Sequence, residues 1–100
     1  MATAKDYVFK YEQRGESNED VLRKLREGEP WFILRAQDRV SSYAISAYAD
    51  ALKSESDKAR ARGEPELGDD LLKQAIGCQS VATAFVNWQL DHPELVKYPD

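Results

Sequence analysis

The chain has 100 residues, of which 42% are hydrophobic and 32% are charged, and its formal net charge at pH 7 is −4. This length predicts one small domain, residues 1–100, that buries somewhat over ~60% of its unfolded surface. The acidic balance argues against duplex nucleic acid as a partner, because duplex-binding domains carry a strongly basic face.

The first ten residues carry no recognisable targeting signal. Residues 1–6 are small and polar, which predicts a frayed terminus, and an apolar core of signal-peptide length is missing. The one cysteine, Cys78, excludes an intrachain disulfide and is compatible with a reducing compartment, so we expect a cytoplasmic protein. The aromatic cluster at 7–11 fits a strand by alternation or a helix turn by spacing. Because no partner strand is evident, we favour a helix turn or irregular structure.

A short helix is predicted over residues 17–27. Ser17 is a good N-cap, acidic residues occupy the first turn, and basic residues occupy the last. Gly28 is placed to end the helix.

An apolar strap is predicted over residues 30–36. Four consecutive large apolar residues, 31–34, follow Pro30, and the chain then turns abruptly polar. Periodicity over four residues does not separate a helix from an extended segment. Because a lone strand would have no ladder partner, we expect a short helix or an extended strap packed against the long helices.

Two long helices are predicted over residues 41–62 and 65–90. The first is rich in alanine, the best helix former, and Gly63 and Pro65 suit a helix end and a helix start. Long helices joined by so short a turn must lie side by side as an antiparallel hairpin. The sequence therefore predicts an all-α domain in which the hairpin is covered by helix 17–27 and the strap, with a C-terminal tail at 93–100.

The second long helix contains the most distinctive stretch, residues 74–90, which carries no charge. Its length approaches that of a membrane span, but its glutamines, asparagine, serine and threonine make insertion costly, so we expect no membrane association. Heptad spacing on both long helices predicts a core of Ile45, Leu52, Leu71, Cys78, Val81, Phe85 and Trp88. The opposite face is small and polar instead of charged, which predicts self-association into a dimer or higher oligomer through Gly77, Ser80, Ala84 and Asn87.

The residues offer little for catalysis. The five glycines are scattered and form no phosphate-binding loop, and one histidine with one cysteine makes no zinc site. His92 stands at a helix end, where it meets terminal carbonyls, and Asp69 and Asp70 suit a helix N-terminus. We expect no enzyme activity, no cofactor and no metal.

The candidate ligand- or partner-binding site consists of Trp31, Arg35, Gln37, Asp38 and Tyr43. In a structural role, Arg35 would pair with Asp38 or with a neighbouring helix, and Gln37 or Asp38 would cap the following helix. In a functional role, Arg35 and Gln37 would line a pocket beside the two aromatic residues and recognise an anionic or planar ligand such as a nucleotide.

Residues 29–38 follow the pattern E-P-x-aromatic-x-L-R-A-Q-D, a long helix follows, and residues 97–100 follow K-x-P-D. With Trp88 between them, they resemble small uncharacterised proteins encoded by bacteriophages and prophages. The resemblance covers roughly residues 29–100 and implies a phage origin, and with it a place in the host cytoplasm. No activity is assigned to these proteins, so the resemblance identifies no catalytic residue in this chain.

Three function classes follow. We expect a non-catalytic helical interaction protein, phage-derived and oligomeric, that binds a host macromolecule such as a host protein. One alternative is a protein that sequesters a small ligand, with a nucleotide second messenger as the candidate. The other is a small structural or assembly protein.

Overall fold

The computed structural model describes residues 18–98, and the described part contains four helical elements. In chain order these are α2 (Asn18–Arg23), α3 (Ser41–Ala61), α4 (Pro65–Asp91) and the short 3-10 helix η2 (Pro93–Leu95). Apart from one isolated β-bridge, no strand occurs among residues 18–98, and the predicted all-α class is confirmed. The predictions for residues 1–6, for 7–11 and for a cap at Ser17 lie outside the described residues.

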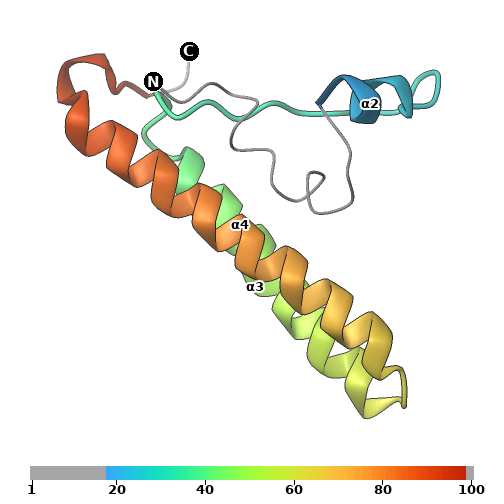
Figure 1. Cartoon of the computed structure of the whole chain (residues 1–100). Coiled ribbons are helices and arrows are strands. Elements are labelled where there is room, and N and C mark those ends of the chain that lie inside the picture. Colours follow the sequence, from blue (N-terminus) through green and yellow to red (C-terminus); the bar gives the residue numbers. More distant parts are fainter. Residues whose placement is uncertain (1–17, 99–100) are drawn as a thin grey trace.

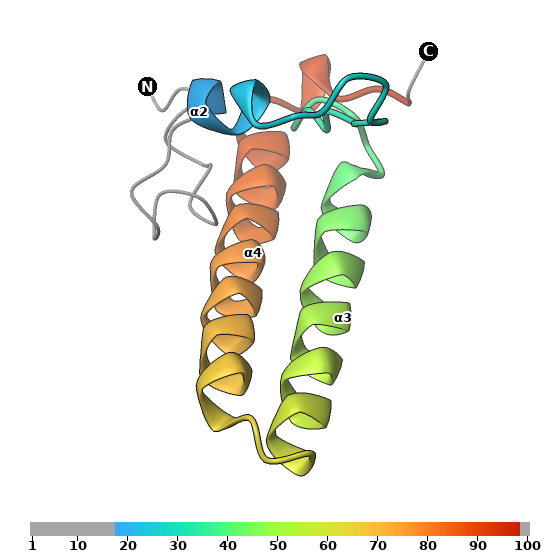
Figure 2. The ribbon, with the colours of Figure 1, turned by 90° about the vertical axis from the view of Figure 1, so that its right-hand side faces the viewer.

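Helices α3 and α4 lie side by side and antiparallel, and Figures 1 and 2 show the hairpin that they form. The predicted helix ends at residues 62 and 90 are each within one residue of the observed ends. At ~1.5 Å per residue, α3 is on the order of 32 Å long and α4 on the order of 40 Å long. We call the end where α3 begins and α4 ends the open end, and the connected end the tip.

The tip is a tight connection that glycine and proline make possible. Gly63 has a φ of 85°, and its N–H donates to the Arg60 carbonyl at 3.1 Å. The next N–H, that of Glu64, donates to the Ala59 carbonyl at 2.9 Å, which completes a Schellman motif. Pro65 then opens α4, where its missing N–H costs no helical hydrogen bond.

The hairpin packs through small side chains. On α3, Ala49, Ser56 and Ala59 are at most 1% exposed, and their spacing of seven and then three residues is that of the a and d positions of a coiled-coil seam. The residues that are buried on α4 are also mostly small: Gly68, Ala75, Gly77, Cys78 and Ala82. Small residues at a seam allow two helix backbones to approach closely, and they leave little apolar volume between them.

The predicted core is confirmed in part. Cys78 and Val81 are buried, whereas five larger residues are only half-buried: Ile45, Leu52, Leu71, Phe85 and Trp88. A pair of helices encloses only the side chains at its seam, so longer side chains at the edges keep one flank in water.

Helix α2 is shorter than predicted. It ends at Arg23 instead of residue 27, and Gly28 lies in a separate turn in which the Glu29 N–H donates to the Arg26 carbonyl at 3.0 Å. Starting a helix is costly, and a short helix has few hydrogen bonds to offset that cost. Helices in proteins are stabilised mainly by packing against other elements, and without extensive packing α2 does not extend beyond six residues.

The strap, residues 30–36, contains no helix in its apolar part and runs across the open end toward α3 (Figures 1 and 2). This observation decides between the two predicted conformations in favour of the extended one. The strap diverges from the hairpin instead of lying along it, and only its C-terminal end is fixed at the open end (Figure 1). Consequently Trp31, Phe32 and Ile33 are exposed and do not cover the hairpin core.

Candidate functional site

Two of the predicted site residues, Gln37 and Asp38, lie in a junction at the open end, where the chain that leads into α3 meets the C-terminal tail. Asp38 and Lys97 form a parallel β-bridge. The Lys97 N–H donates to the Gln37 carbonyl at 2.9 Å, and the Arg39 N–H donates to the Lys97 carbonyl at 2.8 Å. The junction is therefore held by backbone groups of residues that are about 60 positions apart in the sequence.

The side chain of Gln89 ties this junction to α4. Its Nε2 donates to the Ala36 carbonyl at 2.8 Å and to the Asp38 carbonyl at 3.1 Å. The Asp38 carbonyl also accepts from the Ser41 hydroxyl at 2.7 Å, while α3 has no side-chain N-cap. The backbone of Asp38, instead of its carboxylate, thus contacts the start of α3.

Arg35 and Gln37 are brought together. The Arg35 guanidinium donates to Gln37 Oε1 at 3.0 Å, at the surface. Among the described residues, no ion pair joins Arg35 to Asp38, and no hydrogen bond or ring contact joins Trp31 or Tyr43 to Arg35. Within the predicted site, Arg35 and Gln37 are therefore joined by a hydrogen bond at the protein surface, at the end of the strap.

The apolar part of the strap is the most prominent feature near this group. Trp31 is 59% exposed, Phe32 83% and Ile33 62%. Within the part of the chain that the structure describes, the backbone groups of residues 31–34 make no hydrogen bond. Soluble domains seldom leave three adjacent large apolar side chains in water without a binding role.

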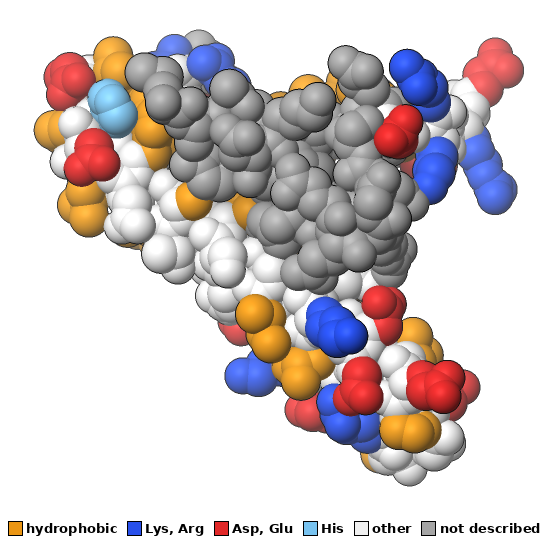
Figure 3. All heavy atoms as spheres, viewed as in Figure 1, with side chains coloured by type: hydrophobic (Ala, Val, Ile, Leu, Met, Phe, Trp, Pro, Cys, Tyr) orange, Lys and Arg blue, Asp and Glu red, His pale blue; other side chains and the backbone are white. Residues whose placement is uncertain are grey.

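Aromatic contacts at the open end involve residues that the sequence did not single out as a site. The Trp88 and His92 rings stack with centroids 4.5 Å apart, and His92 Nδ1 lies 2.9 Å from the Trp88 carbonyl, as expected for a histidine at a helix end. Arg39 lies over the Tyr98 ring at 5.3 Å. Figure 3 shows further hydrophobic side chains around His92 at this end.

The predicted oligomer face is divided between interior and surface. Gly77 is buried and Ala84 half-buried within one chain, whereas Ser80 and Asn87 are exposed. The exposed side of α4 extends from these two residues toward Ile76 and Leu90, and it carries no charge between Lys73 and Asp91.

Residues 18–98 were also considered for groups of metal-ligating side chains and for helices that could span a membrane. They contain no group of three or more His, Cys, Asp or Glu side chains that could hold a metal ion. None of the described helices combines the length and the apolar character that a membrane span requires. No family model, curated protein or solved structure matches the chain.

Proposed function

We propose that this protein is a non-catalytic, phage-derived interaction module that binds a host protein through the apolar part of its strap. One observation supports this function above the others. Trp31, Phe32 and Ile33 stand adjacent and exposed on a segment that is anchored at the open end. We further propose that the acting form is a self-associated one, in which the hairpin is the scaffold.

The energetics of burial favour such a role. Full burial of one large apolar side chain contributes about 1.5–3 kcal/mol, so three of them in a partner's groove supply several kcal/mol. Tryptophan and large apolar residues at the centre of an interface commonly contribute most of its binding free energy. In the free protein the same side chains contribute little, because water surrounds them.

The conformation of the strap indicates the kind of partner. An extended segment with unpaired backbone groups can add as a strand to an exposed sheet edge, while its alternating side chains enter pockets. The hydrogen bonds around Gln37 and Asp38 fix the C-terminal end of the segment, which lowers the ordering entropy that binding must offset. We therefore infer a partner with an open sheet edge flanked by apolar pockets.

The nucleotide alternative has less support. It requires the Arg35 and Gln37 side chains to converge on a ligand beside an aromatic face. Instead, a hydrogen bond of 3.0 Å joins the two side chains to each other at the surface. The assembly-protein alternative makes no use of an exposed strap.

A quantitative capture experiment tests the proposal. The unchanged protein and a Phe32→Asp variant are each immobilised and exposed to host lysate. The variant should capture less than about a tenth of the amount of host protein that the unchanged protein captures, because binding would bury the charge of the new aspartate. Leu67→Asp is the matched control: Leu67 is also exposed, but it lies at the tip in the first turn of α4, where an acidic residue is tolerated.

The outcomes separate the function classes. Loss of capture with Phe32→Asp and retention with Leu67→Asp would support the strap. Capture of equal amounts of host protein by Phe32→Asp and Leu67→Asp would reject the strap as the binding segment. Calorimetric titration with a panel of nucleotides completes the comparison, since heat of binding that Arg35→Ala abolishes would support the sequestering alternative instead.

A further inference from the structure

The outward side of α4 carries a regular stripe that its own chain leaves exposed. Positions spaced alternately by four and three residues stay on one side of a helix, and they form the seam of a coiled coil. Five exposed residues of α4 follow this spacing: Ile76, Ser80, Thr83, Asn87 and Leu90. We call them the outer stripe.

The composition of the outer stripe is unusual for a solvated face. Its two ends are large and apolar, with Ile76 59% exposed and Leu90 72% exposed, and its centre is small or polar. Exposed helix faces ordinarily carry Lys and Glu, but no charged residue lies between Lys73 and Asp91. Val86, which flanks the stripe, is also exposed.

The charges at the two limits of the stripe identify the occupant. Lys73 and Asp91 are 18 residues apart, which is five full helical turns, so they lie on the same side of α4. Both side chains are exposed, and neither forms an ion pair with another described residue. A surface that is positive at one limit and negative at the other is complementary to an inverted copy of itself.

We propose that two copies of this chain form a dimer in which their α4 helices pack antiparallel through the outer stripes, with the two-fold axis near Thr83. In this arrangement Lys73 of each copy lies beside Asp91 of the other, and Ile76 of each lies toward Leu90 of the other. A parallel arrangement would instead place like charges together at both limits. The small central residues allow the two helices to approach closely.

The size of the interface sets the strength of the dimer. Residues 73–91 span on the order of 27 Å on a helix about 10 Å wide, so each copy contributes roughly 270 Å². A standard stable interface takes about 800 Å² from each partner. The dimer should therefore dissociate at micromolar concentrations.

This proposal makes the proposed self-association specific and is independent of the strap. It also moves the contact from the predicted face, because Gly77 is buried and Ala84 half-buried in a single chain. The two faces share Ser80 and Asn87, which lie at their common edge. Failure of the dimer would leave capture by the strap unaffected, so the two proposals are tested separately.

Charge reversal tests the orientation. The full chain is studied by sedimentation over about 5–500 µM, with a far-ultraviolet spectrum to verify unchanged helix content. Lys73→Glu or Asp91→Lys alone should weaken the dimer about three- to thirtyfold, since each change affects two symmetric contacts. The double variant, which restores both pairs with reversed sign, should recover most of the affinity. A monomer mass throughout this range, or no recovery in the double variant, would overturn the proposal.

Disulfide trapping supplies a second readout that does not depend on charge. Thr83→Cys should form a crosslinked dimer under mild oxidation, because residues beside a two-fold axis face their own copies. Ile76→Cys alone should not crosslink, whereas a mixture of Ile76→Cys and Leu90→Cys chains should. The unchanged protein is the control, since its Cys78 is buried. Efficient self-crosslinking of Ile76→Cys would show a parallel pair and reject the antiparallel one.

Discussion

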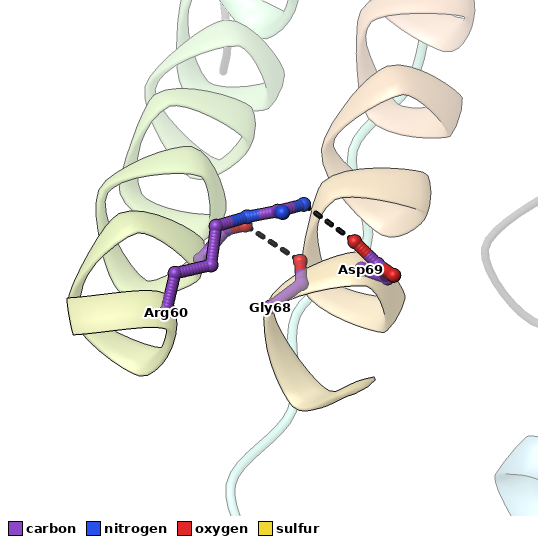
Figure 4. Close-up of polar contacts among 4 residues, drawn as sticks. Arg60, Gly68 and Asp69 are labelled. Atoms are coloured by element: carbon purple, nitrogen blue, oxygen red, sulfur yellow. Dashed lines mark hydrogen bonds and ion pairs between the residues drawn. The ribbon is translucent and has the colours of Figure 1, made fainter. Parts of the chain in front are cut away.

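Gly68 lies at a close approach of α4 to α3, and its replacement by alanine tests the packing of the hairpin. A Cβ at this position would lie 2.7 Å from Cγ of Arg60 and 3.2 Å from the Ser56 carbonyl oxygen. Two interactions bridge the helices here, and Figure 4 shows both. The buried Ser56 hydroxyl donates to the Gly68 carbonyl at 2.6 Å, and the Arg60 guanidinium contacts Asp69 at 2.6 Å.

The expected cost of Gly68→Ala follows from these contacts. Alanine gains about 1 kcal/mol of helix propensity over glycine. The Arg60 side chain must move, which loses an exposed ion pair of about 0.2–1 kcal/mol. The Ser56 carbonyl cannot move alone, so the helices separate and the buried hydrogen bond, about 0.5–1.5 kcal/mol, weakens. The net effect therefore lies between almost no change and a destabilisation of about 1.5 kcal/mol.

Arg60→Ala provides the matched background, because it removes both the obstructing Cγ and the ion pair. In that background only the contact with the Ser56 carbonyl remains, so Gly68→Ala should change the stability by no more than about 0.5 kcal/mol in either direction. The two changes should therefore couple by up to about 1 kcal/mol, the contribution of the ion pair. Urea unfolding of the four variants by circular dichroism, at one protein concentration, measures the free energies. A gain near 1 kcal/mol in both backgrounds would refute the close approach of the helices at Gly68.

Two further predictions concern the turn and the open end. Gly63→Ala places a side chain at a φ of 85°, so it should cost about 1–2 kcal/mol in urea unfolding, and unchanged stability would contradict the described turn. Gln89→Ala removes the donor to the Ala36 and Asp38 carbonyls, so exchange of the Arg39 and Lys97 amides should accelerate roughly five- to hundredfold. Amides in the seam of the hairpin should change little, and equal acceleration there would show that Gln89 supports the whole fold.

The hairpin was predictable because its signals are local and repeated. Alanine-rich and heptad-spaced residues mark the two helices, and Gly63 followed by Pro65 marks the connection. The half-burial of Phe85 and Trp88 was not predictable in the same way. Helical spacing shows which side a residue is on, but not how much other structure covers that side.

For the candidate site, the sequence predicted which residues take part but not the contacts that hold them. The sequence identified Arg35, Gln37 and Asp38, but the junction depends on a hydrogen bond from Gln89 and a β-bridge to Lys97. Such contacts between distant residues leave no periodic pattern. The exposure of Phe32 was missed for a related reason, since four adjacent apolar residues ordinarily indicate burial.

Site-specific photocrosslinking from position 32 tests whether the strap is the segment that binds a partner. A photoreactive phenylalanine analogue replaces Phe32 in one sample and Leu67, at the tip, in another, and both are irradiated in host lysate. If the strap binds a protein of the proposed host, one dominant protein should be attached at position 32 and not at position 67, and added unlabelled protein should reduce the attachment. Equal attachment at both positions, or attachment at position 32 that unlabelled protein does not reduce, would contradict binding through the strap.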